Sequence, residues 1–213
     1  MRVVCLAIAI LVIATPASAD DVIARIDRAR DLYRRGVLVE AAGLLGAVAI
    51  DLQTRLGEDL ARLMPEPPAG WRGGEVRMVA MGTFGGLTVT RGYQMENATL
   101  DAAVLVDSPA VAGVATLLGD PAVLATQPGM RRVRVGDRDA LLRWEGSTRS
   151  GQIMLTLGDH AMLQAVGRGL ADPELLAQFM GGWNIGAVAA RLAPADGEFG
   201  QPGVPKTPPP PAR

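Results

Sequence analysis

Cysteine and histidine, which supply many protein metal sites, nucleophiles and general bases, are almost absent from this chain. Its 213 residues include one cysteine, Cys5, and one histidine, His160. Because Cys5 lies in an N-terminal segment that we expect to be removed, the mature chain has no disulfide, thiolate metal site, iron–sulfur cluster or cysteine nucleophile. One histidine also excludes a multi-histidine metal site within a single chain. We therefore expect no metal and no cofactor.

An excess of charge of one sign is also lacking. The formal net charge is −1, and it becomes −2 when residues 1–19 are removed, since Arg2 is their only charged residue. Proteins that bind nucleic acid or anionic membranes by electrostatics carry clustered positive charge. The balance therefore predicts no nucleic-acid partner.

The N-terminus has the pattern of a cleavable signal peptide over residues 1–19. Arg2 precedes an apolar run over 3–14, and Ala17-Ser18-Ala19 forms an A-x-A cleavage site. The apolar run is shorter than the roughly 20 residues that cross a bilayer as a helix. An uncleaved membrane anchor is the alternative, but the cleavage site favours removal. We predict a periplasmic or secreted protein with no stable membrane insertion after cleavage.

Residues 20–64 are predicted to form a helical hairpin. Apolar residues recur at a period near 3.6, Gly36 can end the first helix, and Pro65 to Pro68 ends the second. We expect the apolar face to pack on the rest of the chain, with a second stripe lining a groove or an oligomer contact. The residues of this face are Leu32, Tyr33, Leu44, Leu45, Val48, Leu52, Leu56 and Leu60.

From Trp71 onward the apolar period changes to two, which is typical of half-buried strands. Strands are predicted at 75–81, 87–96, 100–106, 131–135, 138–145, 151–157 and 160–167. Ser108-Pro109 begins one helix, which Gly119-Asp120-Pro121 ends before a less regular link to Gly129. Asp172-Pro173-Glu174 begins another helix, which Gly181-Gly182 interrupts. The predicted class is α+β: a mainly antiparallel sheet of about six to seven strands over 65–193, packed with helices and preceded by the hairpin. The Gly- and Pro-rich residues 194–213 are predicted to be a disordered tail.

A resemblance adds to this pattern. The entry segment Pro67-Pro68-Ala69-Gly70-Trp71, the helix at Ser108-Pro109 and the hairpin over 133–140 resemble the α/β/α sheet domains of the PsbP/DcrB-like type. Small exported bacterial proteins of unknown function with a helical lead-in are similar. The resemblance covers roughly residues 65–192. It implies a binding or assembly role and transfers no functional residue.

Candidate catalytic and metal-binding residues are few. His160 could serve as a base, but Gly158-Asp159 before it indicates an exposed turn. Met78 and Met81 form an M-x-x-M pair of the kind that binds copper, but residues three apart on a strand point to opposite faces. Asp101 and Asp107 are expected to cap the two ends of a strand. The loop over 146–151 contains no G-x-S-x-G nucleophile motif.

One region has a bias in charge, with a net charge of +3 over residues 131–149. Its arginines are Arg131, Arg132, Arg134, Arg138, Arg143 and Arg149. We expect a solvated outer face, with a weak anionic or protein-binding surface as the alternative.

Taken as a whole, the sequence favours a non-catalytic periplasmic binding or assembly module. The sequence does not specify its ligand or partner, which is an unidentified protein or small molecule. The alternative is an envelope hydrolase-like enzyme that uses His160 and nearby carboxylates. A deep cleft around His160 favours the enzyme, and an apolar groove favours the binding module. The oligomeric state is left open.

Overall fold

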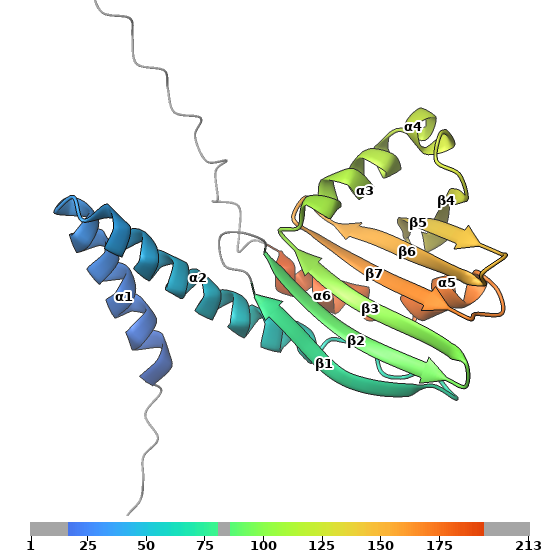
Figure 1. Ribbon diagram of the computed structural model, residues 1–213, viewed down its shortest axis with the longest axis horizontal. Coiled ribbons are helices and arrows are strands. Elements are labelled where there is room, and N and C mark those ends of the chain that lie inside the picture. Colours follow the sequence, from blue (N-terminus) through green and yellow to red (C-terminus); the bar gives the residue numbers. More distant parts are fainter. Residues whose placement is uncertain (1–16, 81–85, 194–213) are drawn as a thin grey trace, which may run out of the picture. The chain divides into compact units, whose positions relative to one another are not determined.

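The computed structural model describes residues 17–80 and 86–193 (Figure 1). The chain forms two compact units, of which the first ends at Leu52 and the second begins at Gln53. Most of the predicted signal peptide, residues 81–85 with Met81, and the predicted Pro-rich tail lie outside the described residues.

The first unit contains helix α1 (Ala17–Arg34) and helix α2 (Leu38–Ala61) as far as Leu52. Gly36 lies between the helices with a φ of 78°, a left-handed conformation that glycine adopts without strain. Arg25 lies between the two helices and forms ion pairs with both Asp21 and Asp51. The prediction of an N-terminal helical hairpin is confirmed.

The second unit is built on a seven-stranded sheet in the order β1-β2-β3-β7-β6-β5-β4, in which every neighbouring pair is antiparallel. The α+β prediction is confirmed, with strand ends within three residues of those expected. The strands are β1 (Arg72–Ala80), β2 (Leu87–Met95), β3 (Ala98–Val106), β4 (Met130–Val135), β5 (Arg138–Glu145), β6 (Ser150–Leu157) and β7 (Ala161–Arg168).

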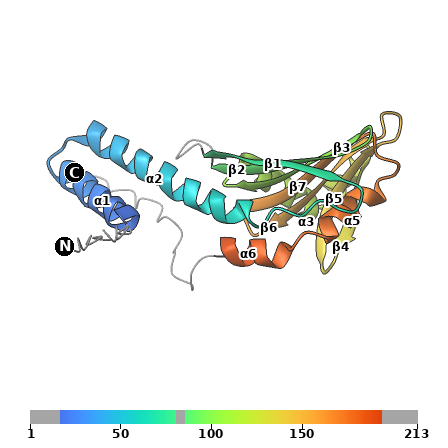
Figure 2. The same cartoon turned by 90° about the horizontal axis from the view of Figure 1, so that it is seen from below.

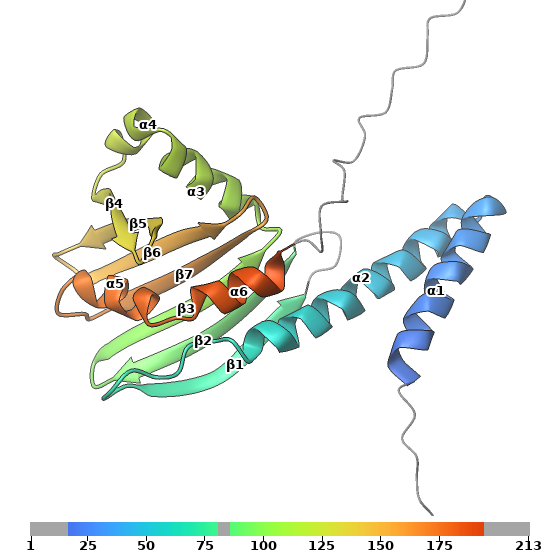
Figure 3. The ribbon, with the colours of Figure 1, turned by 180° about the vertical axis from the view of Figure 1, so that it is seen from behind.

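Alternation along the strands produces two apolar faces of unequal extent. The larger core lies under α5 (Glu174–Gly181), α6 (Ile185–Leu192) and the end of α2, and includes Leu60, Leu100, Leu163 and Met180. Figures 2 and 3 show α5 and α6 along this face of the sheet. The smaller core, on the other face, lies under α3 (Pro109–Gly119) and includes Met154.

Two local expectations are wrong. The link expected to be irregular after α3 contains a short helix, α4 (Pro121–Ala125), because the Asp120 carboxylate accepts hydrogen bonds from the main-chain N–H groups of Ala122 and Val123. Strand β3 begins two residues earlier than expected. Asp101 therefore lies within the strand and does not cap its end.

Candidate binding site

An apolar cavity of about 280 Å³ lies in the second unit between α5, strand β3 and the segment that precedes β1. Its volume is near the lower end of ordinary small-ligand pockets, which begin at about 300 Å³. It is lined by Pro65, Glu66, Pro68, Trp71, Leu100, Leu175, Gln178, Phe179 and Gly182. We call this the α5 cavity.

Hydrogen bonds to one carbonyl hold the proline-rich wall of the α5 cavity in place. The Tyr93 hydroxyl donates to the Pro65 carbonyl over 2.6 Å, and Arg91 Nη1 donates to the same oxygen over 3.1 Å. The Trp71 N–H donates to the Pro68 carbonyl over 2.9 Å and closes a turn through Gly70, whose φ is 84°. Since proline also restricts the backbone, this wall is fixed before any ligand binds.

Helix α5 supplies the opposite wall. Phe179 is buried and lies edge-to-face against Tyr93, with ring centroids 5.1 Å apart and an interplanar angle of 68°. Leu175 is half-buried on the same helix, and Leu100 of β3, 1% exposed, contributes from the sheet. Aromatic and aliphatic side chains from three separate segments therefore surround one space.

Charge is confined to the rim of the cavity. The Glu66 side chain is 90% exposed and lies 3.9 Å from Arg91 Nη1. Burial raises the pKa of Tyr93 to about 12, while the charge of Arg91 acts in the opposite direction. The phenol is thus neutral at physiological pH, and Gln178 adds an exposed amide. The arrangement suits a neutral, apolar group inside and a polar group at the mouth.

His160 does not lie in a cleft. Its side chain is 84% exposed in the turn before β7, and its Nδ1 lies 3.4 Å from Asp107 Oδ1. The nearby Ser108 hydroxyl accepts a hydrogen bond from the Ala110 N–H as the N-cap of α3. Asp101, the other carboxylate considered from the sequence, lies in β3 near Arg168, with 3.9 Å between Asp101 Oδ2 and Arg168 Nη1. The sequence candidates are therefore not brought together in one pocket.

The arginine-rich region is largely engaged within the chain. Arg134 Nη1 lies 3.2 Å from the carboxylate of Asp139, and Arg132 Nη1 lies 3.9 Å from the same group. Arg131 lies 3.5 Å from Glu174, and Arg149 donates to the Leu170 carbonyl over 2.8 Å. These pairings leave less positive charge for an anionic ligand than the sequence suggested.

Neither a metal cluster nor a membrane span is found in the described part of the chain. Residues 17–80 and 86–193 contain no group of three or more His, Cys, Asp or Glu side chains placed to hold a metal ion. None of the helices described is both long enough and apolar enough to cross a bilayer. Met78 lies on β1, whereas Met81 falls outside the described residues.

Comparison with known proteins leaves the α5 cavity as the principal guide to function. No protein-family model matches the chain, and no curated protein or solved structure matches it. The resemblance to PsbP/DcrB-like domains stays a prediction.

The residues of the α5 cavity were not identified from the sequence as a site. Trp71 and the prolines before it were noted only as an entry to the sheet domain, and Phe179 only as an apolar position on a helix. The clustering of prolines and an aromatic residue before the first strand was the available signal. What the sequence lacks is any indication that this segment faces α5, more than one hundred residues further along the chain.

Proposed function

We propose that this protein is a non-catalytic binding module that holds an apolar group, such as an aromatic ring or a branched aliphatic side chain, in the α5 cavity. The single observation that carries the proposal is the cavity itself, an apolar space of about 280 Å³ with aromatic walls and polar groups only at its rim. Well-formed apolar pockets with few polar groups are the usual form of ligand sites.

The fixed wall favours the interpretation of the α5 cavity as a ligand site over its interpretation as an incidental gap in packing. The Pro65 carbonyl is held by two donors, Tyr93 and Arg91, and Phe179 is held by its contact with Tyr93. A wall ordered in advance loses little conformational entropy when a ligand enters, which strengthens binding. The exposed position of His160 gives the hydrolase alternative no comparable support.

The ligand class follows from size and charge. A space of this volume takes one or two rings or a short acyl segment, not an extended polymer. The Glu66 carboxylate and the Gln178 amide at the rim favour a neutral or cationic hydrogen-bond donor beside the apolar group. A hydrophobic side chain of a peptide and a small aromatic amine both have this chemistry.

Two neighbouring glycines allow a matched test. Gly182 lines the α5 cavity, and a Cβ added there meets only carbonyl oxygens of its own helix, at 3.5 and 3.6 Å. Gly181 lies outside the lining, and a Cβ added there has nothing within 4 Å. Gly182→Leu should narrow the cavity, while Gly181→Leu adds the same apolar side chain next to it.

The experiment titrates N-phenyl-1-naphthylamine, a neutral fluorescent amine whose two-ring naphthyl group has the size of the cavity and whose phenyl ring would stay at the mouth, into protein spanning residues 20–213. We expect saturable one-site binding that Gly182→Leu weakens at least about tenfold and Gly181→Leu leaves unchanged. Circular dichroism of both variants controls for folding. Absence of saturable binding to the native protein, or equal loss in both variants, refutes the proposal.

We also propose that the protein works outside the cytoplasm, on the basis of the pattern over residues 1–19. Expression of the full chain in a Gram-negative host, followed by intact-mass analysis of the periplasmic fraction, should give a chain that begins at Asp20. A chain that keeps its N-terminus and stays in the membrane fraction overturns the location but leaves the α5 cavity unaffected.

A further inference from the structure

The two edge strands of the sheet, β4 and β1, differ in how they are protected against pairing with another chain. Strand β4 at one edge has six residues, three of them arginine, and packs against both α4 and α5. Strand β1 at the other edge has nine residues, packs mainly on β2 and contains no proline or lysine. Charged residues, short strands and covering helices are the usual protection of sheet edges against pairing with another chain. Strand β1 also has three charged residues and a β-bulge near its start, but it is longer than β4 and no described helix packs against it as α4 and α5 pack against β4.

Apolar side chains are also exposed on β1. Met78 is 41% exposed and Val79 is 56% exposed, and both belong to the few large apolar residues exposed in the described part of the second unit. An edge strand with free main-chain donors and acceptors and exposed apolar residues is a template for strand addition.

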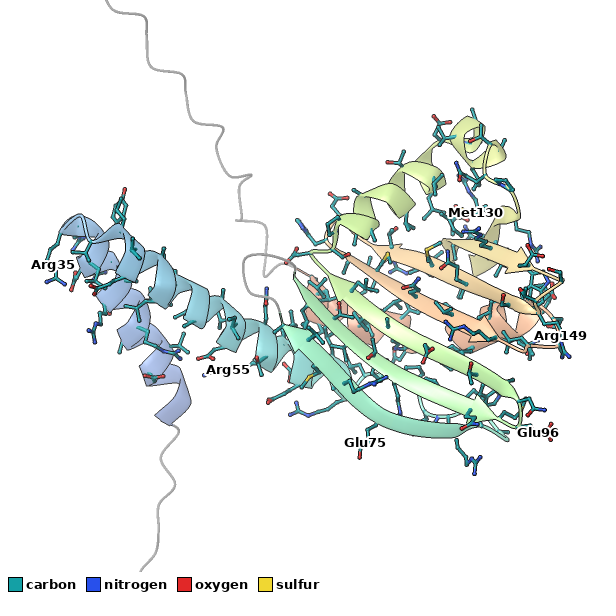
Figure 4. The ribbon with its side chains drawn as sticks, viewed as in Figure 1. Arg35, Arg55, Glu75, Glu96, Met130 and Arg149 are labelled. Carbon is teal, nitrogen blue, oxygen red and sulfur yellow. The ribbon has the colours of Figure 1, made fainter. Side chains whose placement is uncertain are left out.

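Glu75 and Arg77 on β1 have no ion-pair partner among the described residues. Both side chains are exposed, and both residues border the same shallow groove on the face of the sheet opposite α5. Figure 4 shows Glu75 at the free edge of β1, pointing away from the sheet. The two charges are opposite in sign and flank Val76, so they are positioned to match a second strand of the same sequence.

We propose that β1 pairs with β1 of a second copy in antiparallel orientation, with Val76 at the two-fold axis. In this register Glu75 of each copy lies opposite Arg77 of the other, which gives two opposite-charge cross-strand pairs. The same register places Met78 opposite Gly74 and Val79 opposite Gly73. Met78 therefore faces a residue without a side chain, whereas the space beside Gly73 is filled by Pro67 and Arg91 of its own chain.

The pairing joins two sheets through their edges and buries less surface than an obligate dimer requires. We therefore expect a reversible, concentration-dependent dimer. The β-bulge between Gly73 and Val76 lies in β1 itself and bends its first residues, so the regular part of the proposed pairing is centred on Glu75, Val76 and Arg77. This inference is independent of the α5 cavity, which lies on the opposite face from the groove bordered by Glu75 and Arg77.

Sedimentation equilibrium over a range of concentrations tests the proposal on residues 20–213. Native protein should dimerise, and Glu75→Arg or Arg77→Glu alone should raise the dimer dissociation constant at least about tenfold. Each single reversal places two like-charge pairs across the axis. The double variant E75R/R77E restores both pairs and should return the constant to within about threefold of the native value.

Asp159→Arg is the matched control, because it makes the same charge change at an exposed turn away from β1 and should leave dimerisation unchanged. Thermal melts of every variant separate misfolding from loss of pairing, and recovery in the double variant cannot arise from misfolding. A native protein that is monomeric at all concentrations, a dimer insensitive to both single reversals, or a double variant that stays monomeric overturns the proposal. A change in dimerisation by Gly182→Leu is not expected.

Discussion

The indole N–H of Trp183 donates a hydrogen bond to the main-chain carbonyl of Leu63 over 2.8 Å. This bond joins the segment between α5 and α6 to the residues just after α2, and Trp183 is only 3% exposed. Because Pro65 follows Leu63 by two residues, the bond also anchors the start of the proline-rich wall of the α5 cavity.

Trp183→Phe should lower the free energy of unfolding by about 1–3 kcal/mol, since it removes the donor and leaves the Leu63 carbonyl without that partner. Urea denaturation followed by circular dichroism measures the change. Trp144→Phe is the control, because the half-buried indole of Trp144 donates no hydrogen bond to a described residue. Equal losses in the two variants would show that ring size, not the hydrogen bond, accounts for the effect.

The raised pKa of Tyr93 predicts that the folded chain loses stability at high pH. Its pKa is raised by burial from 10.0 to about 12 in the folded chain, so between these values the unfolded chain releases the phenol proton while the folded chain keeps it. The stability that this pKa difference provides is complete below pH 10 and falls as the pH rises toward 12. Tyr93→Phe should remove this part of the decline, at a cost of about 0.5–1.5 kcal/mol near neutral pH for the lost hydrogen bond to Pro65.

Denaturation of native protein and of the Tyr93→Phe variant at a series of pH values between 9 and 12 tests this prediction. The variant Tyr33→Phe, altered at an exposed position, should keep the native decline. If Tyr93→Phe shows the same pH profile as native protein, the phenol is not shielded as described.

Gly86 illustrates a close approach of two backbones. Its φ is 74°, and an added Cβ would lie 2.0 Å from the Val106 carbonyl oxygen, so the strands must move to accept any side chain. Gly86→Ala should cost more than about 3 kcal/mol, which combines left-handed strain with overpacking. Gly158→Ala, with a φ of 64° and nothing within 4 Å of the added Cβ, should cost only about 1–2 kcal/mol. Similar losses at the two positions would contradict the close approach.

The end of α2 belongs energetically to the sheet unit. Leu60 is fully buried in the larger core, whereas Leu45 on the same helix is 49% exposed. Leu60→Ala should lower the stability of the sheet unit by about 2–5 kcal/mol, and Leu45→Ala should change it by less than about 0.5 kcal/mol. Denaturation followed by tryptophan fluorescence reports on the sheet unit, because Trp71, Trp144 and Trp183 all belong to it.

Local patterns were sufficient to predict most elements of the fold. The alternation of Leu87, Val89 and Tyr93 along β2 defines its buried face, and Ser108-Pro109 marks the start of α3. The short helix α4 was missed because its signal, an Asp cap before Pro121, was interpreted as the end of the helix before it. Long-range features were not predictable, because no local period specifies which segment a helix will face.

The candidate site illustrates the same limit. The sequence directs attention to His160, the only histidine, which the structure places on an exposed turn. Neither Phe179 nor Trp71 belongs to a sequence motif. Both line the α5 cavity, whose walls are held by the contact between Phe179 and Tyr93 and by the hydrogen bond from Tyr93 to the Pro65 carbonyl. The hairpin residues Tyr33 and Leu45 are exposed in the first unit, and their predicted role in a groove or an oligomer contact stays a prediction.

The most direct test of the central claim is an NMR titration that follows the indole ¹H–¹⁵N signals of the three tryptophans, assigned with the Trp183→Phe and Trp144→Phe variants. Trp71 lines the α5 cavity, whereas Trp144 does not. With N-phenyl-1-naphthylamine the account predicts a saturable shift of the Trp71 signal and an unchanged Trp144 signal. An unmoved Trp71 signal, or parallel shifts of Trp71 and Trp144, would contradict it.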